Sequence, residues 1–124
     1  MIIGIGIDMI EVERVDEKVR KESGFKEKIF SQGEINECGS GGDAAERFAG
    51  RFAAKEAFLK AIGEGLQLSF SLHEIEIVNT ANGKPEVALH GMFKEMAREN
   101  GWNKIHVSLS HVQAMACAVV IIEQ

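Results

Sequence analysis

Two carboxylates and one lysine are the residues of this sequence whose types could do chemistry together. Glu56 and Lys60 lie four residues apart in "RFAAKEAFLKAIGEG", residues 51–65, and Asp8 follows the alternating stretch "IIGIGI". Mg²⁺ usually takes one or two carboxylates from a protein and completes its shell with water and substrate phosphate oxygens. If the two stretches meet in the fold, Asp8 and Glu56 could hold such an ion beside a phosphate.

Each carboxylate also has a simpler structural interpretation. On a helix, Glu56 and Lys60 could form an exposed i, i+4 ion pair worth about 0.2–0.5 kcal/mol. Asp8 could cap a helix or form a turn. Apolar neighbours of Glu56, among them Phe52 and Leu59, argue for a half-buried face instead. A carboxylate there needs a cation or several hydrogen-bond donors, because losing its water is costly.

Basic residues form two stripes at helical spacing. Arg47, Arg51 and Lys55 recur every four residues in the long helix expected around Glu56. The other stripe runs along residues 10–30, where basic and acidic side chains balance but the basic ones gather on one side. A solvated charged face is the simple interpretation of each stripe, and a binding surface for an anionic partner is the alternative.

His111, in "SLSH", could be structural or could contact a phosphate or nucleotide. A hydrolase of the Ser-His type is not supported, since no G-x-S-x-G elbow surrounds Ser108 or Ser110. The sequence contains neither a G-x-G-x-x-G fingerprint nor a P-loop, and its four histidines lack the close spacing of a zinc site.

Length and composition predict one globular domain spanning residues 1–124. The net charge of −5 argues against nucleic acid as a partner. No apolar run approaches the roughly 20 residues of a membrane span, and no signal peptide is recognisable, so we expect no membrane contact and a cytoplasmic location. The two cysteines have no metal-like spacing, which fits a reducing cytosol. We expect Cys117, in "AMACAVVII", to be a core residue.

Hydrophobic periodicity predicts an α+β fold, with helices first and an antiparallel sheet largely in the second half. Helices are expected over 10–22, 25–30, 31–38, 44–62 and 91–99. Ser31 and Glu34 have the spacing of a capping box, and Asp43 is expected to cap the long helix. Strands are expected over 2–8, 105–110 and 114–123, together with a hairpin that turns at Asn82-Gly83.

Four stretches together resemble the holo-acyl-carrier-protein synthases, the small bacterial type of 4'-phosphopantetheinyl transferase. They are "GIGIDMIEVERV" (4–15), "RFAAKEAFLKAIGEG" (51–65), "NGKP" (82–85) and "HVSLSHVQAMACAVVI" (106–121). The resemblance implies a 4'-phosphopantetheinyl transferase-like fold, in which an antiparallel sheet packs against a long helix and shorter helices. It also implies Mg²⁺-dependent transfer of 4'-phosphopantetheine from CoA to a serine of apo-acyl-carrier protein, leaving 3',5'-ADP. Such enzymes serve fatty acid biosynthesis and usually work as homotrimers with sites between subunits.

The resemblance also assigns roles to residues. Asp8, Glu56 and Lys60 match the catalytic residues, and the two carboxylates among them match the metal ligands. The positions that match the CoA site are Arg51, Lys55, Asn82, Gly83, Lys84, Pro85 and His111. The positions that match the carrier-protein docking surface are Arg14, Lys18, Lys21 and Phe25. Lys18 stands where relatives often carry an apolar residue, and the loop over residues 39–46 is shorter and less basic than in some relatives.

Two other functions remain open at the level of the residues. A Mg²⁺-dependent phosphate-ester hydrolase could use the same two carboxylates without any carrier protein. A non-catalytic module could bind CoA or a nucleotide, or dock to a partner through the basic helix. The joint presence of Asp8, Glu56 and Lys60 favours an enzyme, and a Ser nucleophile from the partner would explain why the chain needs none of its own.

Overall fold

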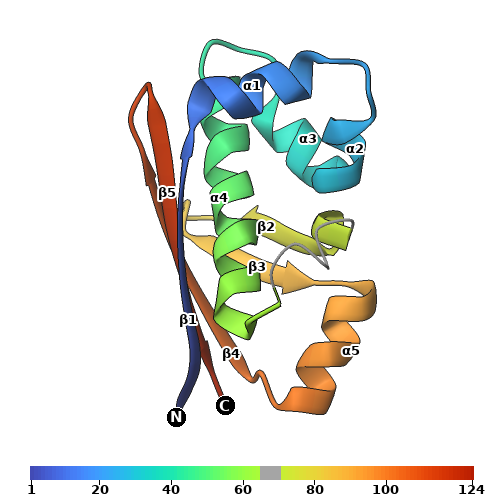
Figure 1. Cartoon of the computed structure of the whole chain (residues 1–124), viewed down its shortest axis with the longest axis vertical. Coiled ribbons are helices and arrows are strands. Elements are labelled where there is room, and N and C mark those ends of the chain that lie inside the picture. Colours follow the sequence, from blue (N-terminus) through green and yellow to red (C-terminus); the bar gives the residue numbers. More distant parts are fainter. Residues whose placement is uncertain (65–70) are drawn as a thin grey trace.

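The α+β prediction is confirmed by the structure, a computed structural model that describes residues 1–64 and 71–124 (Figure 1). The first half is a strand followed by helices: β1 (Ile2–Glu11), α1 (Val12–Arg20), α2 (Phe25–Ile29), α3 (Gln32–Cys38) and α4 (Ala44–Ile62). The second half contains β2 (Ile75–Asn79), β3 (Pro85–Leu89), α5 (Gly91–Asn100), β4 (Lys104–His111) and β5 (Met115–Glu123).

The strands form two separate antiparallel groups. The larger is a three-stranded sheet in the order β1-β5-β4, and the smaller is the hairpin β2-β3. In the larger sheet, Asp8 lies opposite Ala118, which lies opposite Leu109. The first strand of the chain therefore pairs with the last described strand, and this pairing places Asp8 within the sheet rather than on a loop.

Helix α4 packs on one face of the three-stranded sheet (Figure 1). Along β5 every second residue is buried, and these residues form the face toward the core: Ala116, Ala118, Val120 and Ile122. The alternate residues of β5 are only partly buried. This period of two is the pattern of a strand with one covered face and one open face.

Two glycines let β1 approach α4 very closely. A Cβ atom on Gly4 would overlap the carbonyl oxygen of Ala61, and one on Gly6 would overlap the carbonyl oxygen of Ala57. Since residues at every second position of a strand share one face, Asp8 points to the same side as these glycines, toward α4. The "GIGID" pattern thus brings a carboxylate to the surface of the long helix.

Several helix ends lie where they were predicted, but α1 begins at Val12 and ends at Arg20 instead of spanning 10–22, because β1 continues to Glu11 beyond its predicted end at residue 8. Ser31 and Glu34 form the expected capping box at the start of α3, and Gly63 ends α4 in the left-handed conformation. The prediction for Asp43 was wrong, because its side chain makes no capping hydrogen bond within the described chain. Its backbone has a near-helical ψ of 7° instead of the extended conformation that capping requires. Within the residues described, no helix has the length and apolar character needed to cross a membrane.

Candidate active site

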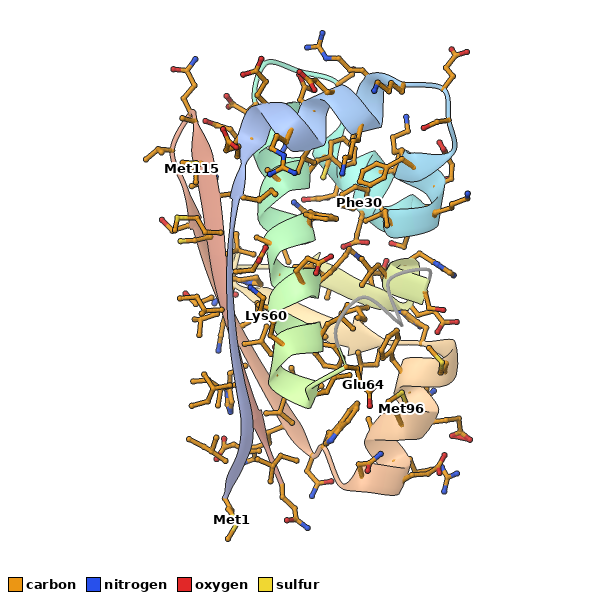
Figure 2. All side chains as sticks on the ribbon, viewed as in Figure 1. Met1, Phe30, Lys60, Glu64, Met96 and Met115 are labelled. Carbon is orange, nitrogen blue, oxygen red and sulfur yellow. The ribbon has the colours of Figure 1, made fainter. Side chains whose placement is uncertain are left out.

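Asp8, Glu56 and Lys60 come together where β1 crosses α4. Lys60 Nζ donates a hydrogen bond to Asp8 Oδ1 at 3.0 Å, and Figure 2 shows Lys60 on the side of α4 that faces β1. Glu56 precedes Lys60 by one helical turn. Burial raises the pKa of Glu56, the nearby charge of Asp8 raises it further, and Lys60 and Lys18 oppose this shift. The two carboxylates are therefore close enough to interact.

The simpler interpretations of these carboxylates were wrong. Glu56 is half-buried, and the ion pair of Lys60 is formed with Asp8, 52 residues away in sequence. Asp8 does not cap α1, because it lies inside β1 and the N-cap of α1 is Glu11. Both side chains thus belong to a long-range cluster rather than to local structure.

The donor set of this cluster fits Mg²⁺. Two carboxylates lie near one ammonium group there, and burial, followed by the charge of Asp8, raises the pKa of Glu56. A divalent cation would remove this repulsion. Among residues 1–64 and 71–124 no group of three or more His, Cys, Asp or Glu side chains could hold a metal. Two carboxylates nevertheless suffice for an ion that takes its other ligands from water and phosphate.

Lys55 does not lie on a phosphate-binding surface, contrary to its predicted role in CoA binding. Its side chain is fully buried, and its ammonium donates to Glu34 Oε1 at 2.7 Å and to the carbonyl oxygens of Leu72 and Ile75. Burial lowers the pKa of Lys55, and the Glu34 carboxylate opposes this shift. Because an ammonium has three donors, none remains for a ligand, and we do not retain Lys55 as a CoA contact.

Arg51 differs from Lys55 because its buried guanidinium is incompletely bonded. The side chain is only 7% exposed, and Nη1 makes one long bond of 3.4 Å to the carbonyl oxygen of Arg47. Nε has no hydrogen-bond partner among the described residues. A buried cation with a free donor is costly, so this position favours an anionic ligand.

The turn over residues 82–85 and His111 lie apart in the single chain. The turn is held by the backbone hydrogen bond from Thr80 N to Lys84 O at 2.8 Å. Beside it, a groove of about 300 Å³ is lined by Lys84 and Pro85 and by the first half of β4, including Lys104 and His106. His111 instead ends β4, and its Nδ1 lies 3.6 Å from Glu46 Oε2 near the start of α4.

The predicted docking residues lie on or just after α1, and one of them, Lys18, lies near the carboxylate cluster. Arg14, Lys18 and Lys21 are exposed on or just after α1. Phe25 is half-buried, with its ring centre 6.1 Å from that of Phe52 on α4, and Lys18 Nζ lies 5.7 Å from the Phe25 ring centre. The charge of Lys18 also reaches Glu56. The basic face of α1 and the carboxylates are thus parts of one continuous region.

Comparisons with known proteins identify the family of the chain. The sequence model of the 4'-phosphopantetheinyl transferase superfamily matches residues 4–120. The chain is 40% identical over 124 residues to a holo-[acyl-carrier-protein] synthase of Koribacter versatilis, which covers 99% of each chain. It superposes on the crystal structure of the Neisseria meningitidis holo-[acyl-carrier-protein] synthase with a TM-score of 0.89 and 33% identity, over 100% of both chains.

A further solved structure contains a ligand. The Bacillus anthracis holo-(acyl-carrier-protein) synthase, in complex with CoA (3',5'-ADP), is 36% identical with a TM-score of 0.81, covering 99% of this chain and 97% of its own. The chain therefore belongs to the 4'-phosphopantetheinyl transferase superfamily. Its relatives are holo-acyl-carrier-protein synthases, which confirms the predicted enzyme class, a phosphopantetheinyl transferase.

Proposed function

We propose that this enzyme transfers 4'-phosphopantetheine from CoA to a serine of an apo-acyl-carrier protein, in a Mg²⁺-dependent reaction. The observation that carries the proposal is the contact of Lys60 with Asp8 one turn from Glu56, in a chain whose relatives are named for this activity. By the same resemblance, we place the enzyme in fatty acid biosynthesis in the cytoplasm, as one domain over residues 1–124.

The reaction transfers a substituted phosphoryl group from an oxygen of CoA to the hydroxyl oxygen of a serine. The serine hydroxyl oxygen of the carrier bonds to the phosphorus that bears pantetheine, the bond from that phosphorus to the oxygen of 3',5'-ADP breaks, and the proton of the serine hydroxyl passes to water. Asp8 and Glu56 would hold Mg²⁺, which when bound neutralises charge on the diphosphate oxygens. Lys60 adds a second positive charge there, because its side chain is 56% exposed beside Asp8 and can reach a phosphate.

The CoA site would include Arg51, the turn at Asn82, Gly83, Lys84 and Pro85, and His111. Arg51 is largely buried and its guanidinium makes one long bond, to the carbonyl oxygen of Arg47, so its positive charge would favour a nearby anionic group of CoA. Lys84 and His111 carry exposed polar groups. The turn and His111 are apart in one chain, which is compatible with a site completed by a neighbouring subunit.

We infer a homotrimer from the resemblance, and the open face of the sheet supports self-association. Its exposed apolar side chains include Ile5 (62% exposed), Ile7 (66%) and Met9 (66%) on β1. The partly buried Val119 and Ile121 of β5 continue this face, opposite Ile7 and Ile5. No described element covers it (Figure 1). A contiguous exposed apolar patch typically marks a protein–protein interface.

Arg14, Lys18 and Lys21 would receive an acidic face of the carrier protein, with Phe25 as an apolar contact at the edge. These cations are exposed, so their attraction to the carrier should speed association and weaken as salt rises.

Intact mass of the carrier protein tests the proposal directly. Apo-carrier, CoA and Mg²⁺ are mixed with the protein, and the carrier should gain one phosphopantetheine arm. EDTA should prevent this gain. An unmodified carrier would contradict the proposal, and loss of CoA diphosphate without any carrier would indicate a phosphate-ester hydrolase instead.

A further inference from the structure

A buried ion pair lies directly behind the proposed metal site and takes no part in binding there. Lys55 is 0% exposed and Glu34 is 1% exposed. Beyond the contacts of Lys55 described above, Glu34 Oε2 accepts the backbone N–H of Ile77 at 2.9 Å, and Oε1 accepts that of Ser31 at 3.0 Å. Every donor of the ammonium and both carboxylate oxygens are therefore engaged.

These hydrogen bonds join three segments of the chain. Glu34 belongs to α3, Lys55 to α4, and the bonded backbone groups of Leu72, Ile75 and Ile77 belong to the turn before β2 and to β2 itself. Successive residues of a helix point about 100° apart, since there are 3.6 residues per turn. A fixed direction for Lys55 toward α3 and β2 therefore fixes the direction of Glu56.

Where α4 faces β1, the packing is close but involves no interlocking side chains. There the helix meets β1 through Gly4 and Gly6, which lie against the backbone of Ala57 and Ala61. Neither glycine nor alanine offers a side chain that interlocks with the partner. Apolar contacts with β5 and the packing of Phe58 on Phe93 and Trp102 also hold α4. The ion pair adds directional hydrogen bonds at Lys55, the residue next to Glu56, and these bonds oppose a small rotation that would move the carboxylate relative to Asp8.

Stability alone is a weak reason for such a pair. Buried ion pairs can often be replaced by apolar side chains with no loss of stability, because their desolvation offsets their attraction. What such pairs do supply is directional bonding, and here three acceptors from two segments outside α4 surround one ammonium.

We propose that Lys55 and Glu34 are a positioning pair, which sets the rotation of α4 so that Glu56 and Lys60 face Asp8. This inference rests on the proposed function, since it concerns the same carboxylates. Neither residue touches the substrate. Loss of the pair would misplace the metal ligands by a fraction of a helical step while the fold persists.

The test replaces both charges together, with Lys55→Met and Glu34→Gln in one protein. Because both charges are removed together, no buried charge is left without its partner. Gln also keeps a side-chain oxygen that can accept the N–H of Ile77. Ile122→Ala is the control for lost stability. Ile122 is buried in the core and pairs with Gly4 across the sheet. Thermal unfolding, Mn²⁺ binding in the presence of CoA followed by electron paramagnetic resonance, and kcat are measured for all proteins.

We expect the paired variant to bind Mn²⁺ at least about 10-fold more weakly and to lose about 100-fold in kcat, as a displacement near 1 Å can cause. The control should keep both values even at an equal Tm. Glu34→Asp, which keeps the charge but shortens the side chain, should show a smaller loss of the same kind and replaces the paired variant if that variant does not fold.

Mn²⁺ affinity and kcat equal to those of the control would overturn the inference. A wild-type protein that transfers phosphopantetheine while these variants behave like the control would leave the proposed function intact. A wild-type protein that neither binds Mn²⁺ nor modifies the carrier would overturn both.

Discussion

Glu56 is held where its own charge is unfavourable. Burial and the charge of Asp8 raise its pKa, so at neutral pH the ionised carboxylate makes the folded state less stable than a neutral side chain would. A group that keeps an unfavourable charge at a cluster of carboxylates is typical of a functional site rather than of a structural one.

We therefore expect Glu56→Gln to lose phosphopantetheine transfer by at least about 100-fold while keeping or raising Tm. Intact mass of the carrier gives the rate, and circular dichroism gives the melting temperature. Glu99→Gln, at an exposed carboxylate of α5, is the matched control and should change neither. A fully active Glu56→Gln enzyme at saturating Mg²⁺ would contradict the role assigned to this carboxylate.

At the residue scale, the sequence identifies the candidate functional residues better than it predicts which groups surround each of them in the fold. Spacing and resemblance singled out Asp8, Glu56 and Lys60, and the structure brings them together, although their spacing alone could not show that residues 8 and 56 meet. Lys55 was misjudged because a basic stripe was assumed to face solvent. Its place three residues after Phe52 and three before Phe58 could have indicated a buried lysine, but its partner Glu34 was recognised only as a capping residue.

At the element scale, the contact of β1 with α4 decides whether a site exists. Gly6→Ala should destabilise the fold by roughly 3 kcal/mol, because its Cβ would overlap the backbone of Ala57, which cannot move as a side chain can. Urea unfolding measures this loss. Gly42→Ala is the control, since a Cβ there meets nothing within 4 Å. Equal midpoints for the two variants would show that β1 and α4 are less tightly opposed than described.

Helix α3, strand β2 and helix α5 meet at another carboxylate, Glu76. Glu76 Oε2 accepts a bond from Ser31 Oγ at 2.7 Å, and Oε1 lies 2.9 Å from His90 Nε2. The bond from Ser31, followed by that of His90, lowers the pKa of Glu76 below its ordinary value of 4.5. These contacts link the hairpin to the helices on either side of it.

A carboxylate with a lowered folded-state pKa stabilises the fold above its unfolded pKa and loses this contribution as pH falls through the folded value. The free energy of unfolding should therefore decrease as pH falls below about 4.5. Glu76→Gln should be less stable than the wild type at pH 7 and should flatten this part of the profile. Urea unfolding at several pH values measures it, and parallel profiles for the two proteins would exclude Glu76 as a source.

Features of the secondary structure could be predicted where a few neighbouring residues determine them. The capping box, the glycine that ends α4 and the turn at Asn82-Gly83 all lie where the sequence placed them. The pairing of β1 with β5, and the separation of the strands into two groups, depend on contacts between distant segments. The prediction that Cys117 is a core residue was wrong. The alternation of β5 directs its side chain to the open face of the sheet, and Cys38 is the fully buried cysteine.

At the scale of the whole molecule, the open sheet face should control assembly. Ile7→Glu would place a charge at the middle of the apolar patch, opposite Val119, and should convert the assembly to monomers. Val112→Glu, at an equally exposed apolar residue (65%) beyond the end of β4, is the matched control. Sedimentation or light scattering measures the mass.

Activity should fall together with assembly if a neighbouring subunit completes the CoA site. A wild-type protein that is monomeric at micromolar concentration, or an Ile7→Glu protein of unchanged mass, would contradict self-association through this face.

The pairing of β1 with β5 has a consequence for biosynthesis. Asp8 lies on β1, yet β5, the strand that holds it in the sheet, is translated after every other described element. A nascent chain that has released α4 but not β5 lacks the partner that fixes Asp8 against the helix. If Asp8 holds Mg²⁺ as proposed, metal affinity should appear only after β5 has paired with β1, so a product that stops before β5 should not bind the ion.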